Sequence, residues 1–211
     1  MRPNVRPARW FSSALGILLL GIALSGCATP QYRFVGSDER DLVIRMPRSW
    51  SALDRSAALK ASGIDPATSS WAVFYDAAAK PVVAHVNSIS TDEPFMYAQS
   101  IPISAEQRPS VTDAQLRELM LPGTPELRDQ AIKAKDFAIL TEQTVSKRKQ
   151  HGVHIRYSFK IGKTKEFYDR IALTDPKRTA VHVLFVHCTE KCFAAHPEID
   201  DVVTSLTLKS H

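Results

Sequence analysis

The chain has 211 residues, of which 44% are hydrophobic and 23% are charged, and its formal net charge at pH 7 is +5. This composition is ordinary for a globular protein with its own core, and the sequence has no tandem repeat or homopolymer tract that would indicate a solenoid or a fibrous protein. Three of the positive charges are leader arginines, so +5 less 3 leaves about +2 on the rest of the chain.

The first 26 residues have the three parts of a secretory signal. Arg2, Arg6 and Arg9 supply positive charge, an apolar run covers residues 14–24, and the small pair Ser25-Gly26 follows. The apolar run is too short to cross a hydrocarbon core of about 30 Å comfortably. The sequence therefore predicts a cleaved signal peptide at residues 1–26.

Cys27 follows these small residues directly, and the whole segment resembles the lipobox of bacterial lipoproteins. The resemblance implies that the Cys27 thiol carries a diacylglyceryl group and that cleavage leaves Cys27 as the first mature residue. We therefore expect an extracytoplasmic protein that is held to the cell membrane by lipid, or to the outer membrane where the organism has one. Ala28 is not acidic, which resembles the pattern that permits transfer to an outer membrane. The alternatives are an ordinary signal peptide with a stray cysteine and an uncleaved membrane anchor.

Residues 27–36 are expected to be the lipidated cysteine and a polar tether, and residues 37–211 a single domain. Apolar and β-branched runs between Asp, Pro and Ser residues predict strands in the first half of this domain. A helix that ends at Gly63 is also predicted there. The predicted strands are 41–46, 71–75, 82–89 and 95–103, and the helix lies around 52–61.

Capping residues predict a helix in the middle of the chain. Thr112 and Gln115 have the spacing of a capping box, and Val111 and Leu116 are placed to form a hydrophobic staple. This helix is expected to end at Leu121, because Pro and Gly follow.

A second helix is predicted directly afterwards. Thr124 is its N-cap and Pro125 its first residue, a position that suits proline. Leu127, Ala131 and Ile132 are expected to face the core.

The clearest strand is 154–161, where Ile155, Tyr157 and Phe159 alternate with polar residues, so one face is expected to be buried and the other solvated. Turn signals separate it from further predicted strands at 138–145, 165–173 and 179–188. After Pro197, four apolar residues have the spacing of a helix that lays one stripe on a sheet: Ile199, Val202, Val203 and Leu206. The predicted fold is α+β, with an antiparallel sheet and helices packed mainly on one face.

Three features together resemble the PsbP-like fold, a group that includes small bacterial lipoproteins. They are a strand ending in Met46-Pro47 with Trp50 just after it, a late antiparallel meander, and a closing helix that runs into Ser205-Leu206-Thr207-Leu208. The resemblance covers most of the mature chain. It implies a non-enzymatic binding or assembly factor.

Cys188 and Cys192 are the residues best placed to carry chemistry. In an oxidising compartment they are expected to form a disulfide that joins the end of a strand to the start of the next helix. One alternative is a copper or zinc site formed by Cys188, Cys192 and His196, which are spaced by four residues. Another is a thiol redox role, although oxidoreductases usually have two residues between the cysteines.

A second candidate site is basic. Lys147, Arg148 and Lys149 lie at a predicted turn, and Arg156 and Lys160 lie on the solvated face of the neighbouring hairpin. Such charges can bind anionic lipid headgroups or wall polymers. The alternative is a solvated sheet face without a partner. We expect no nucleic-acid partner, because the predicted address is extracytoplasmic and the sequence has no RNA-binding motif of stacking and basic residues.

The sequence has no nucleophile elbow, zinc-protease motif, phosphate loop or dinucleotide fingerprint. We therefore predict a non-catalytic binding or scaffolding protein without a cofactor, whose protein partner is unknown. An envelope hydrolase stays the alternative, because residues of a catalytic triad need not be close in sequence.

Overall fold

The computed structural model describes residues 31–39, 42–65, 71–88, 90–147 and 150–208. The chain divides into two units, Met1–Pro30 and Gln31–His211, and every described residue belongs to the second. Its strands are β1 (Tyr32–Ser37), β2 (Leu42–Pro47), β3 (Ser51–Ala52), β4 (Trp71–Asp76), β5 (Phe95–Pro102), β6 (Phe137–Lys147), β7 (Gln150–Ile161), β8 (Thr164–Thr174), β9 (Ala180–Thr189) and β10 (Thr207–Leu208). Its helices are α1 (Arg55–Ser62), α2 (Asp113–Met120), α3 (Pro125–Lys133), α4 (Glu190–Ala195) and α5 (Glu198–Thr204), with short 3-10 helices η1 (Val83–Asn87) and η2 (Arg108–Ser110).

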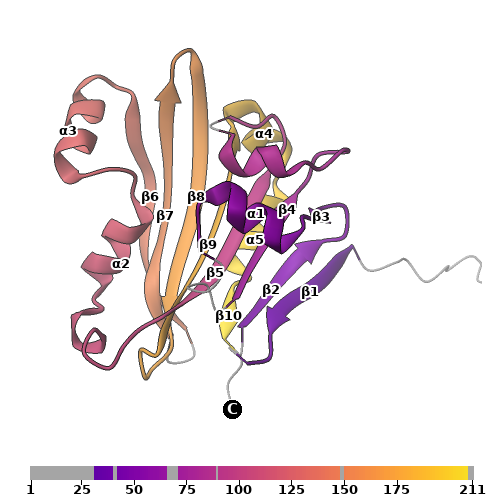
Figure 1. Cartoon of the computed structure of the whole chain (residues 1–211). Helices are drawn as coiled ribbons and strands as arrows, with labels where there is room; N and C mark the ends of the chain where they lie inside the picture. The colour runs from indigo at the N-terminus through magenta and orange to yellow at the C-terminus, as the bar shows by residue number, and fades with distance from the viewer. Residues whose placement is uncertain (1–30, 40–41, 66–70, 89, 148–149, 209–211) are drawn as a thin grey trace, which may run out of the picture. The chain divides into compact units, whose positions relative to one another are not determined.

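Seven strands form one antiparallel sheet in the order β3-β4-β5-β9-β8-β7-β6 (Figure 1). The meander from β6 to β9 confirms the strands predicted in the second half of the chain. Gly162 has a φ of +61° in the turn between β7 and β8, a conformation that glycine adopts without strain. Asp175 holds the next turn, because its carboxylate accepts hydrogen bonds from the backbone N–H groups of Lys177 and Thr179.

One face of this sheet is covered by α4, α5 and a three-stranded sheet in the order β1-β2-β10. Helix α5 lays Ile199, Val202 and Val203 on the sheet, as the predicted helical spacing requires. Inward-facing residues of β2, Leu42 and Ile44, join the same core cluster.

The opposite face is covered by α1 and α2. Helix α1 buries Ala58 and Leu59 against β4 and β5, and α2 buries Leu116 and Met120 in a cluster with residues of β7 and β8. The α+β class and the antiparallel sheet are confirmed, and the helices lie on both faces rather than mainly on one.

Two segments differ from the sequence-based prediction. Residues 32–36, expected in the tether, belong to β1, which pairs with β2 along its whole length. Within 82–89, expected as a strand, residues 83–87 form η1. The strands before and after this segment are β4 and β5, which pair with each other and with β3 and β9. Neither strand has a free edge with which residues 82–89 could pair. The Asp76 carboxylate instead contacts the His85 ring at 2.6 Å and fixes η1 locally.

Within the described part of the chain, no helix has the length and apolarity that crossing a membrane requires.

Candidate interaction surface

Helix α3 exposes two of the three apolar side chains that were predicted to face the core. Leu127 is 57% exposed and Ile132 is 49% exposed, whereas Arg128 is buried. Ala131 is partly buried against the cluster that contains α2. The inward prediction was therefore wrong for Leu127 and Ile132.

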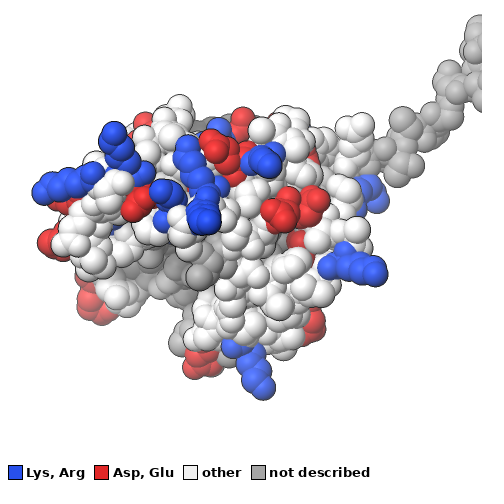
Figure 2. Space-filling view, turned by 90° about the horizontal axis from the view of Figure 1, so that it is seen from above, with Lys and Arg blue, Asp and Glu red and all other residues white. Residues whose placement is uncertain are grey.

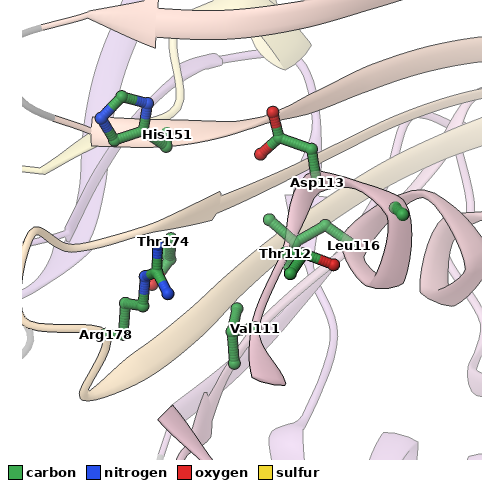
Figure 3. Close-up of a pocket in the computed structure, with 8 residues that line it drawn as sticks. Val111, Thr112, Asp113, Leu116, His151, Thr174 and Arg178 are labelled. Atoms are coloured by element: carbon green, nitrogen blue, oxygen red, sulfur yellow. The ribbon is translucent and has the colours of Figure 1, made fainter. Parts of the chain in front are cut away.

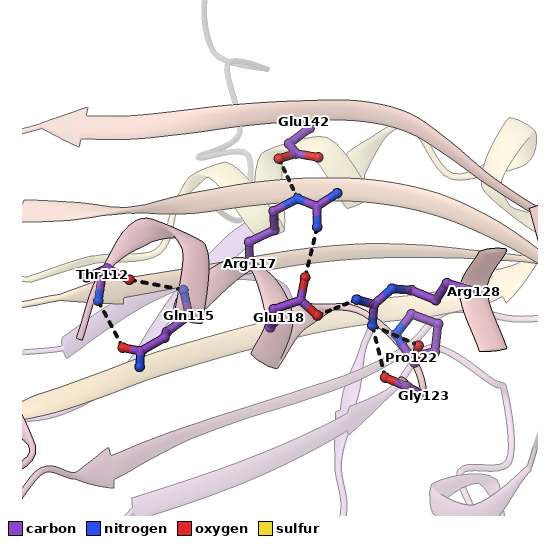
Figure 4. A network of polar contacts seen from close by, with 8 residues as sticks. All are labelled: Thr112, Gln115, Arg117, Glu118, Pro122, Gly123, Arg128 and Glu142. Carbon is purple, nitrogen blue, oxygen red and sulfur yellow. Dashed lines mark hydrogen bonds and ion pairs between the residues drawn. The ribbon is translucent and has the colours of Figure 1, made fainter. Parts of the chain in front are cut away.

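Contacts of Arg128 explain this orientation (Figure 4). Its Nη1 donates to the backbone carbonyls of Pro122 and Gly123, at 3.3 and 2.9 Å, and its Nη2 pairs with the Glu118 carboxylate. A guanidinium carries five N–H donors, so one side chain can satisfy a helix-connecting turn and a carboxylate together. Arg128 and Ala131 thus lie on the face of α3 that is turned toward the domain, and the exposed Leu127 and Ile132 lie on either side of that face.

The same network reaches the edge of the sheet. Arg117 of α2 donates to Glu118 at 2.9 Å and to Glu142 of β6 at 2.8 Å (Figure 4). Because Glu118 also binds Arg128, a chain of ion pairs connects α3, α2 and β6. These charges are partly exposed, so each pair contributes only about 1 kcal/mol or less to the free energy of unfolding. Together, however, the pairs fix how α2, α3 and β6 lie against one another.

Strand β6 forms the edge of the seven-stranded sheet and contains a bulge. Its register with β7 shifts between Ile139 and Thr141, at Leu140. Bulges at sheet edges re-aim side chains. Ile139 is 36% exposed here and Leu140 45% exposed.

Five exposed large apolar side chains therefore lie on three elements that these ion pairs join. We call this the α2–α3–β6 surface, formed by Leu119, Leu127, Ile132, Ile139 and Leu140. Of the large apolar side chains exposed in the described residues, only Phe34 and Val82 lie elsewhere. Scattered exposed apolar residues are common, whereas grouped ones mark interaction sites.

A pocket of about 470 Å³ lies at the N-terminal end of α2 (Figure 3). Its walls come from α2, β7, β8 and the turn after β8, and its lining residues are Val111, Thr112, Asp113, Ala114, Leu116, His151, Thr174 and Arg178. The predicted capping box is confirmed here, since Thr112 and Gln115 exchange both hydrogen bonds. No described contact joins His151 to Asp113 or Arg178, so the pocket contains no assembled acid–base pair.

Cys188 and Cys192 form the predicted disulfide, with their Cα atoms 5.9 Å apart. Cys188 ends the buried part of β9, and Cys192 lies in α4, whose N-terminus is capped by Thr189. Both cysteines belong to the core cluster beneath α5. The bond thus joins a strand end to the following helix, as expected from the sequence.

His196 is engaged by carboxylates rather than by the cysteines. Its Nε2 lies 3.1 Å from Glu93, and its Nδ1 lies 2.8 Å from Glu198. Disulfide sulfurs lack the thiolate that binds copper or zinc, so this form of the protein does not assemble the alternative metal set. Among the described residues, no group of three or more His, Cys, Asp and Glu side chains is placed to hold a metal ion.

The predicted basic site is only partly available. Arg156 is bound to the buried carboxylate of Asp169, through Nε at 3.0 Å, and also to Asp200 of α5. Arg156, predicted on the solvated face, is thus paired with two carboxylates, and its contact with an anionic surface stays a prediction. Its role is structural, because these contacts connect β7 and β8 to α5.

The other predicted basic residues differ in their placement. Lys160 is half-exposed and lies 3.8 Å from Asp136, and Lys147 is the last residue of β6. Arg148 and Lys149, and also Cys27, lie outside the described residues. Seen from above, positive and negative side chains are intermixed over the end of the domain (Figure 2). Contact of Lys147, Arg148, Lys149 and Lys160 with an anionic surface stays a prediction.

An aromatic cluster around Arg170 was not predicted. The Arg170 guanidinium lies 5.0 to 5.3 Å from the ring centres of Tyr157, Tyr168 and Phe185. His187 stacks on Tyr168 at 5.4 Å. The available signal was strand alternation, which places Tyr168 and Arg170 on one face of β8.

This environment changes the ionisation of His187. Burial, and then the positive charge of Arg170, lower the pKa of His187 to about 4. Nearby on β8, burial raises the pKa of Glu166. His187 is therefore neutral in the folded protein near neutral pH.

No protein-family model matches this chain, and no curated protein matches it. Among solved structures it is similar to cyanobacterial PsbP (CyanoP) from Synechocystis sp. PCC 6803, at 9% identity and a TM-score of 0.53, over 87% of this chain and 96% of that one. It is also similar to LpqN, involved in cell envelope biogenesis of Mycobacterium tuberculosis, at 11% identity and a TM-score of 0.44, over 85% and 91% of the two chains. The Ran-binding protein Mog1p of Saccharomyces cerevisiae gives 8% identity and a TM-score of 0.45, over 84% and 95%. The likeness to CyanoP shows that the described domain has the PsbP-like fold that the sequence resembled.

Replacing both Cys188 and Cys192 by Ser is expected to lower the free energy of unfolding by about 2 kcal/mol, because the disulfide closes only a short loop of the unfolded chain. Urea unfolding followed by circular dichroism measures this difference. Equal midpoints for the oxidised wild type and the double variant would contradict a stabilising disulfide.

His187→Gln is expected to reduce the acid sensitivity of the fold. The unfolded chain binds a proton at His187 below about pH 6.5 and the folded chain only near pH 4, so the wild type loses about 3 kcal/mol from this group as the pH falls to 4. Unfolding free energies from pH 7 to 4 measure the difference, with the exposed His151→Gln as control. Glu166 titrates in the opposite sense but is present in all three proteins. Parallel curves for wild type and His187→Gln would refute the assignment.

Proposed function

We propose that this protein is a lipid-anchored, non-catalytic binding domain of the bacterial cell envelope. The anchor is supported by the basic N-terminus, the short apolar run and the small residues before Cys27. Two or three acyl chains on one cysteine give stable membrane attachment, since each buried methylene contributes about 0.8 kcal/mol. The domain then lies on the extracytoplasmic side of the membrane.

The observation that carries the binding role is the α2–α3–β6 surface. On α3, Leu127 and Ile132 are exposed beside Arg128, whose contacts fix how the helix lies. The ion pairs through Glu118 and Arg117 hold the three elements together before any partner arrives. A pre-ordered apolar surface loses little conformational entropy on binding.

A protein is the partner class that fits this surface. Leu127, Ile132 and Leu140 offer apolar area, and Arg117 and Glu142 provide a polar border beside it. An apolar centre with a polar rim is the usual composition of protein interfaces. β6 adds the backbone of an edge strand, which a partner strand can extend.

The alternatives lack a comparable observation. A hydrolase would draw on the pocket beside α2, where His151 and Asp113 make no described contact with each other. Metal or thiol handling would need Cys188 and Cys192 in the reduced form.

Cys27→Ser is expected to release the protein from membranes, because the lipid is the proposed attachment. Flotation of membranes on a density gradient measures the released fraction, with Ser25→Ala as a control that keeps a small residue before Cys27. Membrane attachment of Cys27→Ser equal to that of the wild type would contradict the lipid anchor.

The double variant Leu127→Gln with Ile132→Gln is expected to bind its partner at least tenfold more weakly, because two apolar contacts are lost. Site-specific photo-crosslinking from Leu119 in intact cells reports the complex, and Val82→Gln, an exposed change away from this surface, is the control. Both variants should unfold at the wild-type temperature. An unchanged yield of the Leu119 crosslink in the double variant, or its equal loss in Val82→Gln, would argue against this surface.

A further inference from the structure

We propose that the outer face of β1 rests on the membrane and that Phe34 inserts into the lipid headgroup layer. This inference rests on the lipid anchor at Cys27 proposed above. Phe34 is 76% exposed, which is more than any other large apolar side chain of the described residues.

The strand register places Phe34 on the outward side. In β1, Val35 packs against the core, so Tyr32 and Phe34 lie on the other face of the small sheet. Arg45 of β2 lies opposite Phe34 in register. The outer face of this sheet thus presents an aromatic side chain beside a cation.

The length of chain between Cys27 and β1 limits where the domain can sit. Five peptide steps separate Cys27 from Tyr32, so their Cα atoms are at most about 18 Å apart. A domain of this size has a radius of gyration of roughly 16 Å and a diameter of roughly 40 Å. The linker is therefore too short to place β1 on the side remote from the membrane, and the surface beside Tyr32 must lie close to the lipid.

Contacts around Tyr32 make this surface suitable for the headgroup region. The Tyr32 hydroxyl donates to Asp201 at 3.1 Å, and the Arg45 guanidinium lies 4.8 Å from the centre of the Tyr32 ring. Arg45 also pairs with Asp201 at 2.8 Å, so these two opposite charges offset each other beside the ring. Exposed Arg48 adds a further cation near the end of β2. Aromatic side chains with basic neighbours are typical of protein segments that bind at the membrane interface.

This orientation leaves the α2–α3–β6 surface free. β1 and β2 lie on the opposite side of the described unit from α2 and α3, with the seven-stranded sheet between them (Figure 1). A partner can therefore bind α3 while β1 faces the lipid.

The test compares two single tryptophan additions, Phe34→Trp and Leu127→Trp, in the full lipoprotein. Each variant is isolated from membranes and placed in vesicles of phosphatidylethanolamine and phosphatidylglycerol with brominated or ordinary acyl chains. The mature chain keeps Trp50, which is buried, and Trp71, and the wild type measures the quenching of this shared background. We expect brominated lipid to quench the emission added at position 34 at least twofold and to leave the emission added at position 127 unchanged.

Intact mass separates the two ways in which the inference can fail. A mass without lipid on Cys27 removes the proposed anchor and the membrane contact with it. A lipidated Phe34→Trp protein in which the emission added at position 34 is not quenched removes only the membrane contact. In that case, red-shifted emission would place position 34 in water, and blue-shifted emission would indicate a second copy or another protein over β1.

Discussion

Strands β8 and β9 are buried on both faces, and this constraint decides where the other elements lie. Ile171 and Leu184 face the cluster beneath α5, whereas Ala172 and Val183 face the cluster beneath α2. A sheet with two apolar faces needs two covering layers. The small sheet with α4 and α5 supplies one layer, and α1 with α2 supplies the other. The disulfide and the contacts of buried Asp169 fasten the first layer to the sheet.

Both faces of the sheet are covered, so the apolar residues that stay exposed are not part of a core that lacks a covering layer. They lie at the margins, on α3 and the β6 edge on one side and on β1 on the other. Hydrogen bonds from buried Arg128 fix the orientation of α3. The β1 margin follows the predicted lipid attachment by only a few residues in the sequence. The proposed contacts, lipid at β1 and a protein at the α2–α3–β6 surface, would together make the domain an anchored binding module.

Local patterns in the sequence predicted much of this fold, because burial and capping depend on neighbouring residues. The Thr112 capping box and the apolar stripe of Ile199, Val202 and Val203 on α5 were confirmed. Along β7 the expected division into a buried and a solvated face was wrong, because Ser158 is buried while Phe159 and Ile161 are half-buried. The errors arose where contacts between residues far apart in the sequence determine burial or secondary structure. Arg128 is buried by carbonyl groups of a turn and by a carboxylate of another helix, and its own position in α3 does not indicate this. Likewise, η1 replaces a predicted strand because the edges of β4 and β5 are occupied. The disulfide was predicted correctly, whereas the α2–α3–β6 surface was visible only as an apparently inward apolar stripe.

The most direct test of the anchored binding domain is the intact mass of the protein isolated from the membranes of its own cells. We expect a chain that begins at Cys27, carries the mass of acyl groups, and is two protons lighter than the reduced form because of the Cys188–Cys192 bond. A chain that retains residues 1–26, or a mature chain without lipid, would contradict the proposed lipid anchor.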